Sequence, residues 1–210
     1  MFCVKGLRYQ DILSIDSLSI DKPVTCIVGP SGSGKSTLLK MLNRMLVPDA
    51  GEVYYNGKSL AETDAVELRR EVCMLSQTPV IYPGDIRDNL QIGLSFSGRL
   101  AKSDQKLREA MEKIGLSKSL DDSPQTLSGG EKQRLCLCRV MLLEASCYLL
   151  DEPSAALDKD TEHAVLKSFV DDCRAGQRQI VMVTHSKEAA ASFADEIVTL
   201  QNGGIGGGEA

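Results

Sequence analysis

The sequence predicts an α/β fold with a mostly parallel sheet, and two patterns support this. Short apolar runs typical of buried strands recur along the chain, at residues 24–28, 72–75, 147–150, 180–183 and 197–200. Segments with helical spacing, such as residues 162–173, separate several of these runs. Strands that alternate with helices form parallel sheets, whose strands are buried on both faces and therefore show no polar alternation.

The N-terminal quarter predicts further short elements. Residues 1–20 alternate loosely between apolar and polar types, which favours short strands with turns over a helix. Val53-Tyr-Tyr followed by Asn56-Gly57 is a strong β-hairpin signal. Between the N-terminal strands and this hairpin we expect a helix that ends before Pro48. It would carry Leu38, Leu39, Leu42 and Leu46 on its apolar face.

We expect a single domain over residues 1–202. The sequence becomes more polar over residues 83–125, with helical spacing at Leu107, Met111 and Ile114. This pattern predicts a helical subdomain inserted between the two parts of the core. Residues 1–82 and 126–202 would then form the core together with the N-terminal strands. The glycine-rich residues 203–210 are expected to be a flexible tail.

Composition restricts the possible partners. The 210 residues carry a net charge of -5, from 24 basic and 29 acidic side chains, so we expect no nucleic-acid partner. No apolar stretch is long enough to span a bilayer or to act as a signal peptide, so we expect no direct membrane insertion. The seven cysteines have no zinc-site spacing, and we interpret them as reduced core residues.

A phosphate-binding loop follows the first buried run. Residues 29–36, Gly-Pro-Ser-Gly-Ser-Gly-Lys-Ser, match the pattern G-x-x-x-x-G-K-S/T in full. Glycines allow backbone N–H groups to face inward, and the following helix adds partial positive charge. Lys35 can then reach the β- and γ-phosphates, and the Ser36 hydroxyl can ligate magnesium. The loop alone does not distinguish kinases, GTPases and motors.

Two adjacent carboxylates end a second apolar strand. Asp151 and Glu152 follow the run 147–150, and the carboxyl end of a parallel strand is where an open α/β sheet builds its site. We expect Asp151 to hold magnesium. Glu152 can act as general base on a water in line with the γ-phosphate.

A second anion-binding motif lies at residues 127–131, Leu-Ser-Gly-Gly-Glu, which continue as Lys-Gln-Arg-Leu. As a structural feature, Ser128 would cap the helix that follows. The same hydroxyl, with small residues at Gly129 and Gly130 and free N–H groups at a helix start, can also bind an anion. A chain with one complete phosphate cradle has no obvious need for another.

In their order and spacing these motifs resemble the ATP-binding cassette (ABC) ATPase family over nearly the whole chain, from Tyr9 through Gln77 to Asp158 and His185. The resemblance implies a P-loop NTPase (RecA-like) core with Walker A and Walker B motifs, an N-terminal antiparallel β-subdomain and a helical insertion. It implies ATP and Mg²⁺, with two ATP molecules sandwiched in a head-to-tail homodimer. The motif at Ser128 would complete the ATP site of the opposite subunit.

The resemblance also implies roles residue by residue. The catalytic residues would be Glu152, His185, Gln77 and Lys35, and the metal ligands Ser36, Gln77 and Asp151. Tyr9 would stack on adenine, and Asp158 would communicate across the interface. The other nucleotide-binding residues would be Gly29, Pro30, Ser31, Gly32, Ser33, Gly34, Lys35, Ser36, Thr37, Ser128, Gly129 and Gly130. Ala155 stands where the family often has serine, which removes one polar contact across the interface.

We expect an ATPase subunit that powers solute transport through a separate integral membrane permease. Residues 78–90 resemble the segment that receives coupling helices, most closely that of small two-subunit exporters, including putative iron or metal efflux systems, and less closely that of phosphate importers and fused exporters. An apolar docking groove is expected around Val80, Ile81, Tyr82 and Ile86. Such a subunit would be cytoplasmic, peripheral on the inner face of the cell membrane.

Two alternatives belong to other functional classes. A soluble ABC ATPase in DNA repair or translation would need long coiled coils or two cassettes, and the chain has neither signature. Nucleic-acid work would also favour a basic surface. A small-molecule kinase would have no use for the Leu-Ser-Gly-Gly-Glu motif. The solute and the direction of transport are expected to depend on the membrane subunit.

Overall fold

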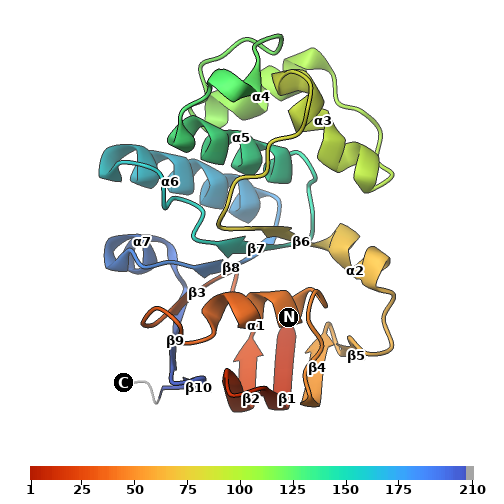
Figure 1. The fold of residues 1–210 in the computed structure, drawn as a ribbon, viewed down its shortest axis with the longest axis vertical. Coiled ribbons are helices and arrows are strands. Elements are labelled where there is room, and N and C mark those ends of the chain that lie inside the picture. Colours follow the sequence, from red (N-terminus) through yellow and green to blue (C-terminus); the bar gives the residue numbers. More distant parts are fainter. Residues whose placement is uncertain (207–210) are drawn as a thin grey trace.

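A computed structural model describes residues 1–206. The elements lie in layers, with α3, α4 and α5 at one end, then α6, a six-stranded sheet, α1 and a four-stranded sheet at the other end (Figure 1). Among residues 1–206, no helix is both long and apolar enough to cross a membrane.

The six-stranded sheet confirms the predicted parallel core. Its strand order is β10-β9-β3-β8-β7-β6, and every pair is parallel except β10 with β9. The strands are β3 (Val24–Val28), β6 (Val72–Leu75), β7 (Cys147–Asp151), β8 (Gln179–Val183), β9 (Glu196–Gln201) and β10 (Gly204–Ile205). Side chains alternate between two cores, so that Tyr148 and Leu150 enter one and Cys147 and Leu149 the other.

The second core lies between the two sheets. The antiparallel sheet has the order β2-β1-β4-β5 and is formed by β1 (Phe2–Tyr9), β2 (Leu13–Ile20), β4 (Ala50–Tyr55) and β5 (Lys58–Ser59). Helix α1 (Lys35–Leu42) packs between it and the parallel sheet with Leu38, Leu39 and Leu42 fully buried. The Asn56-Gly57 turn joins β4 to β5 with positive φ at both residues, which confirms the predicted hairpin.

Helices cover the other face of the parallel sheet. They are α3 (Ile86–Phe96), α4 (Asp104–Lys113), α5 (Gly129–Met141), α6 (Lys159–Ala175) and α7 (Lys187–Phe193), with a 3-10 turn at Pro124–Thr126. Helix α2 (Ala65–Glu71) lies at the β6 edge of the sheet and buries Leu68 in the second core. Helix α5 contacts α3, α4 and β6. The expected helical subdomain, residues 83–125, contains α3, α4 and most of the 3-10 turn, and its bounds stay a prediction.

The expectation of a flexible tail from residue 203 is wrong for residues 203–206. Asn202 and Gly203 form a second two-residue turn with positive φ, and β10 pairs back onto β9. The Gly206 N–H also donates to the Thr199 carbonyl, at 2.8 Å. Asn202-Gly203 is the same hairpin signal as Asn56-Gly57. The many glycines that follow it are typical of a tail, and the prediction followed that composition. Residues 207–210 lie outside the described residues.

The buried cysteines lead to a first prediction. All seven thiols are free, and burial raises the pKa of six of them, with Cys26, Cys138 and Cys173 reaching about 12. Thiolates are the reactive species, so the raised pKa values keep these thiols protonated and slow to react near neutral pH. A thiol reagent should label at most Cys3 rapidly in the native protein and all seven after unfolding in guanidinium. Rapid native labelling of any thiol besides Cys3 would contradict this core.

Candidate functional site

One cleft of about 430 Å³ collects most of the motifs. It forms where β3, β8, β7 and β6 end, because parallel strands in register deliver the segments that follow them to the same edge of the sheet. Its lining residues are Ile12, Ser31, Gly32, Gly34, Lys35, Ser36, Thr37, Gln77, Glu152 and His185. Ile12 was missed in the sequence, where it has only the pattern of a strand residue.

The phosphate loop is held tightly at two glycines. A Cβ atom on Gly29 would lie 2.0 Å from the Leu200 carbonyl oxygen, and one on Gly34 would lie 2.6 Å from a Leu13 methyl group. Both glycines have positive φ, which other residues rarely adopt. The loop is therefore fixed between the end of β9 and the start of β2.

The interior of the loop is suited to an anion. Lys35 is 5% exposed, and its ammonium donates to the carbonyls of Gly29 and Pro30 at 2.9 and 2.8 Å. Within residues 1–206, no carboxylate forms an ion pair with Lys35. The Ser33 hydroxyl is buried without a hydrogen-bond partner, which is uncommon for a buried polar atom. Unpaired positive charge and a spare hydroxyl fit the phosphates of ATP.

Two oxygen groups face each other beside the loop. The Ser36 hydroxyl, at the start of α1, donates to the Asp151 carboxylate at 2.9 Å. Burial raises the pKa of Asp151, because removal from water penalises the charged form. Oxygen ligands of this kind suit Mg²⁺, which keeps most of its coordination positions for water and phosphate. The pair therefore fits the implied magnesium ion.

Three polar side chains converge on the neighbouring position. The Gln77 amide donates to one oxygen of Glu152 at 3.0 Å, and Nε2 of His185 lies 3.1 Å from the other. Glu152 itself has φ of 48°, a strained value for a residue with a Cβ atom. Its N–H donates to the Val183 carbonyl of the adjacent strand. The carboxylate is thus aimed into the cleft between residues from β6, β7 and β8.

Gln133 holds this arrangement from α5 and was missed in the sequence. Its side chain is 3% exposed, donates to the Glu152 carbonyl and accepts from the Ala156 N–H, both at 2.8 Å. It therefore fixes the backbone at both ends of residues 152–156. The sequence signal for this role is the position of Gln133 in Lys-Gln-Arg-Leu, which directly follows the second anion-binding motif, Leu127–Glu131 (the signature).

The second anion-binding motif lies apart from the cleft. Ser128 caps α5 as expected: its hydroxyl accepts from the Glu131 N–H, and the Glu131 carboxylate accepts from the Ser128 N–H. That contact and Lys118 lower the pKa of Glu131 to about 2. Ser128 and Gly129 are exposed. None of Ser128, Gly129 and Gly130 lines the cleft of its own chain.

Several other predicted site residues also lie outside the cleft lining, namely Tyr9, Gly29, Pro30, Ser33, Asp151 and Asp158. Tyr9 is half-buried at the end of β1, and its carbonyl accepts from the Ile12 N–H across the turn. Asp158 is exposed and caps α6, where the Thr161 N–H lowers its pKa. Gly29 and Pro30 line a separate hollow behind the phosphate loop.

Comparison of sequences relates the chain to transport ATPases. The family model described as "ABC transporter" matches residues 17–155. A phosphate import ATP-binding protein, PstB 2 of Lactobacillus acidophilus, is 32% identical over 95% of this chain and 85% of its own length. PstB of Aeropyrum pernix is 37% identical over 87% of this chain and 77% of its own.

Solved structures agree with the sequence comparison. A dimeric post-hydrolysis state of the ATP-binding cassette MJ0796 with ADP and Pi bound has a TM-score of 0.87 and 26% identity, covering 98% of this chain and 96% of that one. A bacterial Atm1-family ABC exporter with ATP bound has a TM-score of 0.88 and 25% identity, covering 98% of this chain and 38% of that one. The chain therefore belongs to the ABC transporter family as an ATP-binding subunit, an ATPase that acts on ATP with Mg²⁺.

Proposed function

We propose that the chain powers solute transport through a separate membrane permease, with two ATP sites in a head-to-tail homodimer. The position of the second anion-binding motif supports this most directly. Ser128 and Gly129 are exposed at the start of α5 and do not line the cleft of their own chain. An exposed anion-binding helix start fits the γ-phosphate of an ATP molecule held by a second copy. Each cleft would be completed by the partner.

Hydrolysis in this proposal depends on Glu152 as general base. Its carboxylate can take a proton from a water that Gln77 and His185 orient from either side, since both already contact its oxygens. Lys35 would leave the carbonyls of Gly29 and Pro30 to bind phosphate oxygens. Ser36 and Asp151 would hold Mg²⁺, which when bound neutralises charge on the phosphates.

An apolar groove of about 200 Å³ between β6, α3 and α5 is the proposed docking surface for the permease. Val80, Tyr82 and Phe96 line it, and Val80 and Phe96 are 49% and 67% exposed. Ile86, expected to take part, is fully buried at the start of α3 and does not line the groove. An apolar residue beside a turn can face either the core or solvent, and only packing decides which.

The edge of the groove is held by α5. Arg139 donates to the carbonyls of Val80 and Asn89 at 2.9 and 2.6 Å and lies over the Tyr82 ring, at 5.0 Å. Asn89, fully buried, exchanges hydrogen bonds with both backbone groups of Tyr82. Because α5 begins at the signature, a shift of that helix would reach the docking segment directly.

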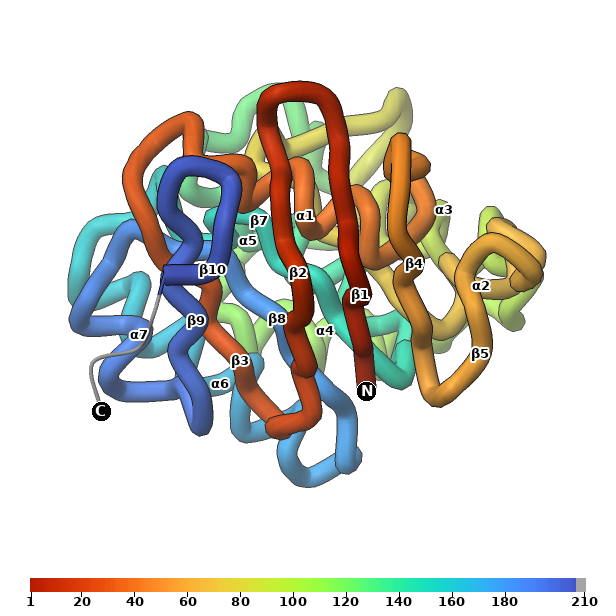
Figure 2. Tube along the Cα trace, turned by 90° about the horizontal axis from the view of Figure 1, so that it is seen from below, coloured from red at the N-terminus to blue at the C-terminus, as the bar shows by residue number. Residues whose placement is uncertain are grey.

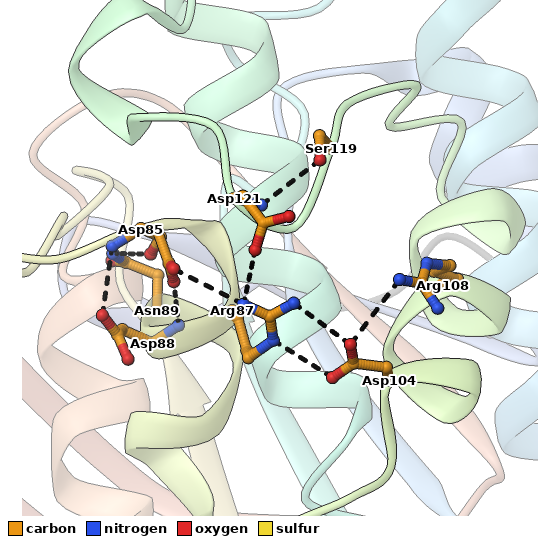
Figure 3. Close-up of polar contacts among 8 residues, drawn as sticks. All are labelled: Asp85, Arg87, Asp88, Asn89, Asp104, Arg108, Ser119 and Asp121. Atoms are coloured by element: carbon orange, nitrogen blue, oxygen red, sulfur yellow. Dashed lines mark hydrogen bonds and ion pairs between the residues drawn. The ribbon is translucent and has the colours of Figure 1, made fainter.

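An ion-pair network joins the helices beside the groove (Figure 3). Arg87, in the first turn of α3, binds Asp104 at the start of α4 through two 3.1 Å hydrogen bonds and Asp121 through one of 2.7 Å. The same contacts lower the pKa of Asp104 and raise that of Arg87. We infer that α3 and α4 move as one body when nucleotide binds.

The names of the relatives favour transport over a soluble role. They include phosphate import proteins, a glycine betaine/carnitine/choline transport protein of Bacillus subtilis and an iron-sulfur cluster transporter of Saccharomyces cerevisiae. These solutes differ widely among chains of similar sequence, which supports the proposal that the permease determines the solute. A permease-bound subunit of this kind would lie on the cytoplasmic face of the membrane.

The first functional prediction tests the general base. Glu152→Gln should bind MgATP with near-normal affinity but hydrolyse it about 100- to 10,000-fold more slowly, because the amide cannot accept the proton. Steady-state phosphate release and nucleotide titration measure the two effects. Lys35→Ala is the control and should mainly lose nucleotide affinity. Near-normal turnover by Glu152→Gln would assign the base to another residue.

The second tests the composite site. Ser128→Arg should leave ATP binding by the monomer intact, since Ser128 does not line its own cleft, but should abolish ATP-driven dimers and hydrolysis. Sedimentation in the Glu152→Gln background, with and without MgATP, measures dimer formation. Full activity from a species that stays monomeric at high concentration would refute the composite site.

The third tests docking with two matched valines. Val80→Asp should weaken copurification of the permease from detergent-solubilised native membranes at least tenfold, because a carboxylate would be buried in an apolar contact. Val66→Asp, at a similar exposure of 54% on α2 and outside the groove, is the control. Basal ATPase should be unchanged in both. Equal permease recovery with the two variants would place docking elsewhere.

A further inference from the structure

The hairpin that ends the described chain contacts the wall of the nucleotide cleft from behind. Figure 2 shows β10 beside β2, although the two strands belong to different sheets. The Gly203 carbonyl accepts a hydrogen bond from the Ser14 N–H at 2.8 Å. The β9–β10 turn is thereby fixed to the first residues of β2.

The contact at Gly203 leaves no space for a side chain. A Cβ atom there would lie 2.4 Å from the Ile12 carbonyl oxygen, a separation that real Cβ atoms essentially never show. Backbone cannot give way as a flexible side chain can, so the Tyr9–Leu13 turn would have to move.

That turn forms one wall of the cleft. Ile12 lines the cleft directly, and its N–H is bonded to the carbonyl of Tyr9. On the other side of the turn, Leu13 packs against Gly34 in the phosphate loop. Gly203, the Tyr9–Leu13 turn and the phosphate loop therefore form a continuous series of contacts.

We propose that the β9–β10 hairpin positions the Tyr9–Leu13 turn so that the nucleoside part of ATP can pack against it. This inference rests on the proposed contact of Tyr9 with adenine. Gly203 is a positioning residue here, because it touches the wall and not the nucleotide. The phosphate loop is also anchored at Gly29 against the Leu200 carbonyl of β9, and pairing of β9 with β3 holds that strand in place apart from the contact at Gly203.

The chain offers a matched control for the test. Asn56-Gly57 and Asn202-Gly203 are both two-residue turns, with φ of 49° and 79° in the first and 49° and 77° in the second. Alanine at either glycine therefore meets the same backbone strain. A Cβ atom on Gly57 has nothing within 4 Å, so only Gly203→Ala displaces the wall.

The test compares Gly203→Ala with Gly57→Ala by calorimetric titration with a non-hydrolysable ATP analogue and with inorganic tripolyphosphate. Gly203→Ala should bind the analogue about five- to tenfold more weakly, because part of the base stacking is lost, and should bind tripolyphosphate normally. Gly57→Ala should bind both like the parent chain. Thermal unfolding should shift to lower temperature in both variants from the shared backbone strain, and further in Gly203→Ala because of the added clash with the Ile12 carbonyl.

Other outcomes separate this inference from the site itself. Equal analogue affinity in the two glycine variants, with Tyr9→Ala weakened, would overturn the role of the hairpin and leave the adenine contact standing. Normal affinity in all three variants would overturn both. A loss of both ligands by Gly203→Ala would show that the hairpin holds the phosphate loop and not the nucleoside wall, which also contradicts the proposal.

Discussion

The parallel register of the central sheet is the constraint on which the site depends. Strands β3, β8, β7 and β6 run in the same direction, so the four segments that follow them emerge at one edge. Residues separated by more than a hundred positions, such as Ser36 and Asp151, meet there at hydrogen-bond distance. The strands are held in that register by burial on both faces, with alternate side chains in two separate cores.

The helical layer adds to this edge through few contacts. Gln133 of α5 bonds to the backbone at Glu152 and Ala156, so the helix that displays the signature also fixes the acid of its own cleft. Farther along the same helix, Arg139 bonds to Val80 and Asn89 beside the apolar groove. Helix α5 thus begins with the exposed signature and contacts both the backbone at Glu152 and the docking segment at Val80.

Local signals in the sequence were sufficient for the parallel strands, the β4–β5 hairpin and the cap at Ser128, since each depends on neighbouring residues. They were insufficient where packing decides. Ile86 and Ile12 are both apolar residues near turns, yet the first is fully buried and the second lines the cleft. Gln133 acts through groups distant in sequence, so its role is visible only in three dimensions. The roles given to individual site residues stay predictions.

The contact of Lys35 with its own loop has a consequence for ligand selection. The ammonium is solvated by two carbonyl oxygens of its own chain, at 2.9 and 2.8 Å. Any anion must therefore replace neutral dipoles that the protein itself supplies, and a weak or singly charged competitor gains little from the exchange. A polyphosphate gains enough, because several of its oxygens can compete at once. We expect this exchange to favour polyphosphates over small anions before any contact with the base is made.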